Sequence, residues 1–350
     1  MQRCPISAGW SPKPTPPSRQ RRTQYKFRRS LVAEWREVRI ESVAQVAEGI
    51  LDILLCPITE QPLVLAEPGA HIDVRLPNDL IRQYSIHQCH GAGGGYQLGI
   101  GLAVPSRGGS SFIHEHFKAG QTVEISAPRN HFGLDTNAPG YVFIAGGIGI
   151  TPILSMIRWC EVHDKPWQLL YCARNRARAA YYQEIPADRV TLHLDDEHQG
   201  WPDLKAFIGQ ARPGEHLYCC GPAPLMDAVD DVARAVMPAQ NIHFERFSAP
   251  VADVDSQRNG QDSSFTIALA QSGVEYTVPA QSSVLDVLEA AGVSMPYSCR
   301  EGLCRTCECT VLEGEVDHRD YVLSDQERDS NQVMLLCVSR ARSSKLVLDL

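Results

Sequence analysis

Four cysteines near the end of this 350-residue chain have the spacing of a metal-ligand set. Cys299, Cys304 and Cys307 follow one another as CxxxxCxxC, and Cys337 lies further along the chain. A plant-type 2Fe-2S cluster uses this arrangement, because three thiolates come from one loop folded around it and the fourth from a distant strand. Structural zinc sites usually combine two short motifs that each supply two ligands, whereas here the second motif is the single Cys337. The spacing predicts a 2Fe-2S centre, with zinc or unligated core cysteines as alternatives. Cys309 falls in a predicted strand and is expected in the core.

Composition and charge limit the partners and the cellular location that the protein is expected to have. A formal net charge of −8 argues against a nucleic-acid partner. Twelve cysteines without a signal peptide indicate a reducing compartment, so we expect a cytoplasmic protein. The uncharged run 136–157 is rich in glycine and proline, which favours a strand, a turn and a helix start over a membrane span. Residues 1–24 are expected to be a disordered basic tail, with a transit peptide as the alternative.

Residues 25–136 have the pattern of a β-barrel. Short apolar runs are separated by turn residues such as Pro77, Asn78 and Gly120, which is typical of an antiparallel barrel. The predicted strands are 50–56, 70–76, 81–87, 95–103 and 121–127, with one short helix at 110–117.

Two stretches of this barrel could hold an anionic aromatic ligand. Arg82, Tyr84 and Ser85 offer a phosphate ligand, a stacking plane and a hydroxyl, and alternation would send Arg82 and Tyr84 to one face. A glycine loop then leads into the predicted helix, where backbone N–H groups and the helix dipole favour a phosphate. This loop consists of Ser106, Arg107, Gly108, Gly109, Ser110 and Ser111. Each stretch alone could be structural, but together they favour a flavin.

Strands alternate with helices in residues 137–248, which predicts a parallel sheet covered on both faces. The predicted strands are 141–145, 167–173, 190–194, 216–220 and 241–247, and helices are expected to begin near Pro152, Arg178, Asp203 and Ala223.

Ligands of such sheets bind at the carboxyl ends of strands, where two predicted turns lie. The first could receive a pyrophosphate at a helix start, with Thr151 as its N-cap. It comprises Gly146, Gly147, Gly149, Thr151 and Pro152. The second is Cys220, Gly221 and Pro222. A tight turn and a buried cysteine are the structural alternatives.

Residues 249–262 are predicted to be a linker and 263–350 a third domain. That domain opens with a hairpin around Gly273. A helix follows at 284–291, with Ser283 and Asp286 spaced as a capping box and Gly292 as its stop. The cluster loop comes next, and 345–350 closes the sheet.

In this order, RxYS, GGS, the glycine turn, CGP and the cysteine spacing resemble the phthalate dioxygenase reductase and vanillate demethylase reductase family. The resemblance runs from about Tyr25 to Leu350. It implies three domains: an FMN-binding antiparallel barrel, an NAD-binding α/β domain and a β-grasp ferredoxin. It also implies NADH as electron donor and a Rieske-type terminal oxygenase as partner.

The resemblance assigns roles to individual residues. Arg82 would hold the FMN phosphate together with Gly109, Ser110 and Ser111. Tyr84 would pack on the isoalloxazine, and Ser85 would lie near its N5. Cys220 would lie beside the nicotinamide C4, and Phe247 would approach the flavin ring. Arg305 is a departure, because many relatives have glycine between the second and third cysteines.

The residues that follow predicted strand 167–173 bear on whether the chain uses NADH or NADPH. Arg174, Arg176 and Arg178 follow it, with no acid before Glu184. Arginines there could accept the 2′-phosphate of NADPH, whereas the family favours NADH. We expect NADH and keep NADPH open; Asp195 and Asp196, after the third strand, are expected to be a solvated loop.

The three predicted sites fit one electron path. Nicotinamides give up two electrons as hydride and a 2Fe-2S centre takes one, so a flavin between them can accept the pair and release it singly. We expect an oxygenase reductase. The alternatives are a reductase for another one-electron acceptor, a self-sufficient monooxygenase, for which no Rieske pattern is present, and a non-enzymatic redox sensor.

Overall fold

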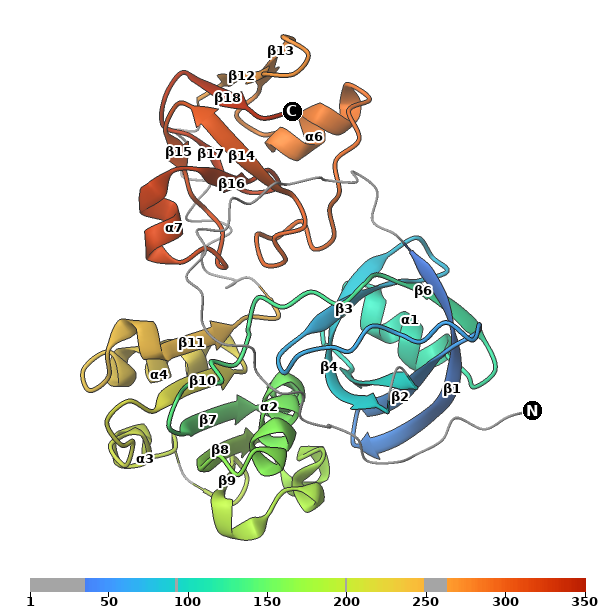
Figure 1. Ribbon diagram of the computed structural model, residues 1–350, viewed down its shortest axis with the longest axis vertical. Helices are drawn as coiled ribbons and strands as arrows, with labels where there is room; N and C mark the ends of the chain where they lie inside the picture. Colours follow the sequence, from blue (N-terminus) through green and yellow to red (C-terminus); the bar gives the residue numbers. More distant parts are fainter. Residues whose placement is uncertain (1–34, 92–93, 199, 249–262) are drawn as a thin grey trace, which may run out of the picture.

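The computed structural model describes residues 35–91, 94–198, 200–248 and 263–350. The predicted tail 1–24 and the predicted linker 249–262 lie outside these ranges. Figure 1 shows a barrel, a layered sheet with helices and a smaller mixed body that meet around a common centre.

The first body is a closed antiparallel barrel, as predicted. Its strands are hydrogen-bonded in the order β1 (Arg36–Ala47), β2 (Ile50–Pro57), β5 (Gly95–Gly101), β4 (Ile81–His90), β3 (His71–Arg75) and β6 (Thr122–Ile125). Helix α1 (Gly109–His116) packs its Ile113 into the barrel core. The sequence prediction missed β1 because most of its side chains are polar or exposed, and within it only Val38 and Ile40 are buried.

The second body is a parallel five-stranded sheet. Its order is β11 (Ile242–Glu245), β10 (His216–Cys220), β7 (Tyr141–Gly146), β8 (Trp167–Ala173) and β9 (Val190–Leu194). Alternate residues of β7 point to opposite faces, which is the period of two expected of a strand. Tyr141 and Phe143 pack in the cluster that includes α2 (Ile150–Val162), whereas Val142 and Ile144 join α3 (Leu204–Ile208) and α4 (Ala223–Ala233). The sheet is therefore covered on both faces, as predicted.

The helix predicted near Arg178 is wrong. This connection instead contains the short 3-10 helices η2 (Arg176–Arg178), η3 (Tyr182–Glu184) and η4 (Ala187–Arg189). The backbone N–H of Arg178 donates to the Asn175 side chain, and Tyr181 has a positive φ of 59°. A residue in the left-handed region cannot continue an α-helix, so the chain turns before a second helical turn forms.

The third body contains the cysteine loop. Its sheet has the order β13 (Glu275–Val278), β12 (Phe265–Leu269), β18 (Lys345–Leu348), β14 (Glu308–Glu313) and β16 (Val333–Leu335), with β15 (Val316–Asp317) paired to β17 (Arg340–Ala341). The predicted capping box of α6 (Val284–Ala290) forms between Ser283 and Asp286. Cys309 is buried in the core of this body, as predicted. The prediction missed the six-residue helix α7 (Asp325–Ser330).

Among the helices of the described residues, none is long and apolar enough to cross a membrane.

Candidate active site

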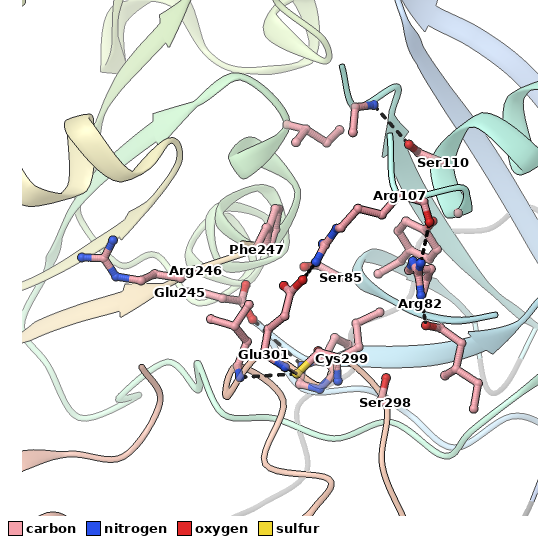
Figure 2. Close-up of a pocket in the computed structure, with 18 of the residues that line it drawn as sticks. Arg82, Ser85, Arg107, Ser110, Glu245, Arg246, Phe247, Ser298, Cys299 and Glu301 are labelled. Atoms are coloured by element: carbon pink, nitrogen blue, oxygen red, sulfur yellow. Dashed lines mark hydrogen bonds and ion pairs between the residues drawn. The ribbon is translucent and has the colours of Figure 1, made fainter. Parts of the chain in front are cut away.

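A cavity of about 640 Å³ lies where the barrel, the parallel sheet and the cysteine loop meet. Its size falls in the usual range for cofactor sites. Figure 2 shows residues of all three bodies around it, including Arg82 and Ser110 of the barrel, Glu245 of β11 and Cys299 of the loop.

Arg82 is held against the glycine loop at one end of the cavity. Its guanidinium donates to the carbonyl oxygens of Ile81 at 2.9 Å and Arg107 at 2.8 Å. A Cβ on Gly109 would lie 2.6 Å from the Arg82 side chain, so glycine here leaves room for Arg82 in its present position. Gly108 at the N-cap of α1 has no side chain to cap the helix, and the N–H of Ser111 donates to the Ser106 hydroxyl at 3.4 Å, which leaves the N–H groups of Gly109 and Ser110 for a ligand at this end. An arginine fork beside such N–H groups is a fitting site for a phosphate.

Of the two serines expected to hold a phosphate, one lines the cavity and the other bonds within the glycine loop. Ser110 lines the cavity, and its hydroxyl accepts from the backbone N–H of Ala103 at 3.1 Å. Ser111 does not line it and bonds instead to the Ser106 hydroxyl at 3.2 Å. Ser111 therefore supports the shape of the loop.

Strand β4 supplies the middle of the cavity wall. Residues 82–85 all line it, so it is not confined to the one face that alternation predicted for Arg82 and Tyr84. Two buried polar atoms here, the Ser85 hydroxyl and the Gln83 amide nitrogen, have no hydrogen-bond partner among the described residues. Buried polar groups are normally paired, so these two fit the polar edge of a bound ring. Burial raises the pKa of Tyr84, whose hydroxyl therefore stays neutral.

The two predicted nucleotide turns pack directly on each other. A Cβ on Gly221 would lie 3.0 Å from the Gly146 Cα, and a Cβ on Gly146 would lie 2.6 Å from the ring of Pro222. Glycine at both positions lets the two backbones meet at the carboxyl ends of β7 and β10. Of the residues predicted here, only Thr151 lines the cavity.

The predicted N-cap at Thr151 is wrong. Helix α2 begins at Ile150 after the 3-10 turn η1 (Gly147–Gly149), with Gly149 at the cap position. The Thr151 hydroxyl donates to the carbonyl oxygen of Ile148 at 3.0 Å. Gly147 allows this tighter entry because its φ of 54° is accessible to glycine. The helix N-terminus is thus formed by backbone groups alone.

Cys220 is fully buried behind the cavity wall. Burial, followed by the neighbouring Glu245 carboxyl, raises the pKa of its thiol well above the ordinary value. A thiol in that state is neutral, so it is not a nucleophile. Phe247, the other residue predicted near the ring, is partly exposed and lines the cavity.

Glu245 is a cavity residue that the sequence prediction missed. Its carboxyl lies at the end of β11, and one oxygen has no hydrogen-bond partner in the described structure. Burial raises the pKa of Glu245 to about 8, while burial and the charge of Arg129 lower the pKa of His71 to about 3. The contact of 4.0 Å between them is therefore one of two neutral groups at pH 7, not an ion pair. The signal in the sequence was the one carboxylate in predicted strand 241–247.

The four predicted ligand cysteines come together in two pairs. The Cys299 thiol contacts that of Cys304, and the Cys337 thiol contacts that of Cys307. Within the described residues no group of three or more donor side chains has the geometry of a single-ion site. Two pairs of thiols match a centre with two irons, each of which takes two protein sulfurs.

The loop backbone points its N–H groups at sulfur. Glu301 and Leu303 donate to the Cys299 sulfur at 3.3 and 3.4 Å, and Cys299 donates to the Cys304 sulfur at 3.5 Å. Left-handed backbone at Arg300, Gly302 and Arg305 produces this curvature. Such donors stabilise thiolates around a cluster.

Arg305, the departure from the family pattern, takes a conformation that suits glycine. Its φ is 55°, which costs an arginine about 1–2 kcal/mol. Its guanidinium offsets this cost by donating to Glu308 and to Glu327, each at 2.7 Å. The residue that departs from the pattern thus ties the loop to β14 and α7.

The cysteine loop is attached to the barrel beside the cavity. The Ser298 hydroxyl donates to Asp73 of β3 at 3.2 Å, and Asp73 also pairs with Arg129 at 2.8 Å. Arg107 of the glycine loop forms an ion pair with Glu301 (Figure 2). Cys299 therefore lies in the wall of the cavity that Arg82 and Ser85 line.

This arrangement defines an oxidoreductase in which a nucleotide domain, a flavin cavity and an iron–sulfur loop share one junction. The chain matches the family described as oxidoreductase NAD-binding domain over residues 143–231 and that described as 2Fe-2S iron-sulfur cluster binding domain over residues 267–342.

Full-length relatives extend these matches. Vanillate O-demethylase oxidoreductase of Pseudomonas sp. (strain HR199 / DSM 7063) is 40% identical over 321 residues, which cover 90% of this chain and 99% of the relative. Phthalate dioxygenase reductase of Burkholderia cepacia is 35% identical over 319 residues, covering 89% and 97%. A solved phthalate dioxygenase reductase structure aligns with a TM-score of 0.66 and 36% identity, covering 90% of this chain and 98% of that one. The crystal structure of an intact type IV self-sufficient cytochrome P450 monooxygenase aligns with a TM-score of 0.83 and 34% identity, but this chain covers only 41% of it.

The chain belongs to the phthalate dioxygenase reductase family. It is an electron-transfer reductase with a nicotinamide-nucleotide domain and a 2Fe-2S domain, which confirms the predicted family, the fold class and the NAD and 2Fe-2S cofactors.

We expect Cys304→Ser to abolish the visible absorbance of the cluster and cytochrome c reduction, because one iron would lose a sulfur ligand. Flavin bleaching by NADH should persist, since the barrel and parallel sheet are unchanged. The matched control is Cys309→Ser, in the same body but outside the pairs. Equal loss of cluster absorbance in both variants would contradict the assignment.

We expect Arg82→Ala to purify with most of its FMN lost, and Arg82→Lys to retain more, because a lysine keeps the charge but not the fork. Flavin released on denaturation, per protein, measures the occupancy. Arg75→Ala is the control, since Arg75 pairs with Glu124 on the barrel surface. Full occupancy in Arg82→Ala would rule out its phosphate role.

Glu245 should make the wild-type protein lose stability between about pH 5 and 8. Its pKa is raised to about 8 by folding, so the unfolded chain ionises in this window while the folded chain holds its proton. Glu245→Gln should have a flatter profile of Tm against pH, and exposed Glu275→Gln should follow the wild type. A Glu245→Gln profile parallel to the wild type would show that this carboxyl is ionised in the folded state.

Proposed function

We propose that this chain is the reductase component of a cytoplasmic oxygenase or demethylase system and that it delivers electrons from NADH to a terminal oxygenase of the Rieske type. The observation that carries the proposal is the shared cavity, in whose wall the phosphate-binding end at Arg82 and the ligand cysteine Cys299 both lie. Relatives named as vanillate and phthalate system reductases support an aromatic acid as the substrate of the partner. The thiols of the described chain are all free, which suits a reducing compartment.

When bound, FMN takes up the two electrons of a hydride and the 2Fe-2S cluster passes on single electrons. The protein's part is to bind, orient and shield. Arg82 and the start of α1 would hold the FMN phosphate, with Gly109 leaving room for both. Ser85 and Gln83 would hydrogen-bond the ring edge, since the Ser85 hydroxyl and the Gln83 amide nitrogen have no hydrogen-bond partner in the part of the chain that the structure describes. Tyr84 would pack against the ring.

The nicotinamide side of the cavity is kept neutral. Gly146, Gly147 and Gly149, with Pro152 in the helix they open, would receive the pyrophosphate on backbone N–H groups. Cys220, with Gly221 and Pro222, would position the nicotinamide. The protonated Glu245 carboxyl can present an O–H to the cavity, since its pKa is about 8. Phe247 would cover the ring.

The cluster side is fixed by the attachment of the loop to the barrel. Cys299, Cys304, Cys307 and Cys337 would hold the cluster in the two observed pairs. The contacts Ser298 to Asp73 and Arg107 to Glu301 hold this loop at the cavity, which keeps the electron path short.

The proposal is tested by supplying acceptors. Purified protein reconstituted with FMN and iron–sulfur cluster is given NADH and a Rieske-type aromatic oxygenase with its substrate, and product formation is coupled to NADH oxidation. A cytochrome P450 is the second acceptor, because of the structural similarity to the self-sufficient P450. Product formation with the P450 but not with the Rieske-type oxygenase would identify a P450 as the partner instead. Failure to reduce either protein, ferricyanide or cytochrome c would reject an electron-transfer role and favour a redox sensor.

Glu301→Gln should slow NADH-dependent cytochrome c reduction by about twofold to fivefold, the scale of one lost partly exposed ion pair. Flavin bleaching by NADH, measured by stopped flow, should be unchanged because the nucleotide side is intact. Glu315→Gln, which removes a surface partner of Arg342 in the same body, is the control. A Glu301→Gln rate equal to that of the wild type would show that this pair does not hold the loop in place.

A further inference from the structure

The segment after β8 lies where a nucleotide-binding sheet meets the adenosine ribose. Strand β8 pairs in parallel with β7, and Cys172 is opposite Gly146. The segment 174–178 therefore begins beside the glycine turn, at the carboxyl end of the next strand. In sheets of this kind, a side chain at this position contacts the ribose 2′-hydroxyl of NAD or the 2′-phosphate of NADP.

Two of the three arginines in this segment are occupied by carboxylates. Arg178 donates to Glu48 at 2.5 Å, and Arg176 donates to Glu197 at 3.4 Å. Neither acid lies next to the arginines in the sequence. Glu48 belongs to the turn between β1 and β2 of the barrel, and Glu197 follows β9. The backbone N–H of Glu48 also donates to the carbonyl oxygen of Ala177 at 2.8 Å, which fixes the turn against this segment. Figure 1 shows that end of β1 and β2 beside the parallel-sheet body.

The third arginine has acids beside its backbone. Asp195 and Asp196 follow β9, and their N–H groups donate to the carbonyl oxygens of Ala173 and Arg174 at 3.0 and 3.2 Å. These contacts place the predicted solvated loop beside the start of segment 174–178. Three arginines thus lie in one region with four acidic residues, Glu48, Glu197, Asp195 and Asp196.

We propose that Glu48 and Glu197 are specificity-determining residues that make the chain prefer NADH, by neutralising the arginines that would otherwise bind the 2′-phosphate of NADPH. A 2′-phosphate carries about two negative charges, so each nearby carboxylate opposes it, whereas a ribose 2′-hydroxyl has no charge to oppose. The arginines would also have to leave their partners to reach the phosphate. The inference rests on the proposed use of a nicotinamide dinucleotide as donor.

The effect has a definite size and salt dependence. Exposed charges act through water, so each carboxylate changes the relative affinity for the 2′-phosphate by roughly threefold to fivefold at low ionic strength, and less at high salt. Removing both acids should therefore change the preference by about tenfold or more. The acids contribute little to folding, because isolated surface ion pairs stabilise weakly.

The test compares the wild type with the double variant Glu48→Gln/Glu197→Gln. Binding of 2′,5′-ADP and of 5′-AMP is measured by calorimetry at low salt, which requires no turnover. The double variant should bind 2′,5′-ADP about tenfold more tightly, with 5′-AMP binding unchanged, and the gain should shrink in 0.5 M salt. With ferricyanide as acceptor, the ratio of kcat/KM for NADPH to that for NADH should rise by a similar factor.

The matched control is Glu275→Gln, which breaks an exposed pair with Lys345 in the third body and should leave the ratio unchanged. If the double variant is unstable, Glu48→Gln and Glu197→Gln are measured singly, and each should bind 2′,5′-ADP roughly threefold to fivefold more tightly. An unchanged 2′,5′-ADP affinity in a folded variant, or an equal gain for 5′-AMP, overturns the proposal. Failure of the wild type to oxidise either nucleotide would instead overturn the proposed function, so the two failures are distinguishable.

Discussion

The curvature of one loop is the constraint on which the rest of the structure depends. Four thiols can meet only if the backbone around Cys299 to Cys307 turns back on itself, and three residues in left-handed conformations provide that turn. Gly302 meets the requirement by having no side chain, since a Cβ would lie 2.7 Å from Val338. Arg305 meets it through ion pairs with Glu308 and Glu327. The same curvature directs backbone N–H groups at sulfur and leaves Cys299 facing the cavity.

Charge is distributed around the cavity in a way that suits the chemistry on each side. The proposed phosphate end is cationic, with Arg82 fixed in place by two carbonyl oxygens. The proposed nicotinamide side is neutral, because Glu245 and His71 are both uncharged at pH 7. At the proposed adenosine end the arginines are balanced by acids from other elements. Burial keeps Glu245 and His71 uncharged, and ion pairing neutralises the arginines. Neither effect follows from a residue's type alone.

Local patterns predicted the elements with strong periodicity or a distinctive end. The capping box at Ser283 and Asp286 and the alternation along β7 depend on neighbours in the chain, so they could be read in advance. The prediction failed where a local cue competed with the tertiary structure. Thr151 has the chemistry of an N-cap, yet a left-handed Gly147 moves the helix start to Ile150. Strand β1 was missed because only two of its residues enter the core and the others are partly or fully exposed.

By itself, the sequence determined the cysteine spacing, the RxYS and CGP segments and the order of three domains, because each of these is a property of consecutive residues. The tertiary structure alone decided that Glu245 enters the cavity as a neutral acid, that Ser111 does not line it, and that Glu48 reaches Arg178 from another domain. Burial and charge pairing act through space between residues far apart in the chain. They raise the pKa of one carboxyl and occupy a guanidinium that, in the sequence, has no acid beside it.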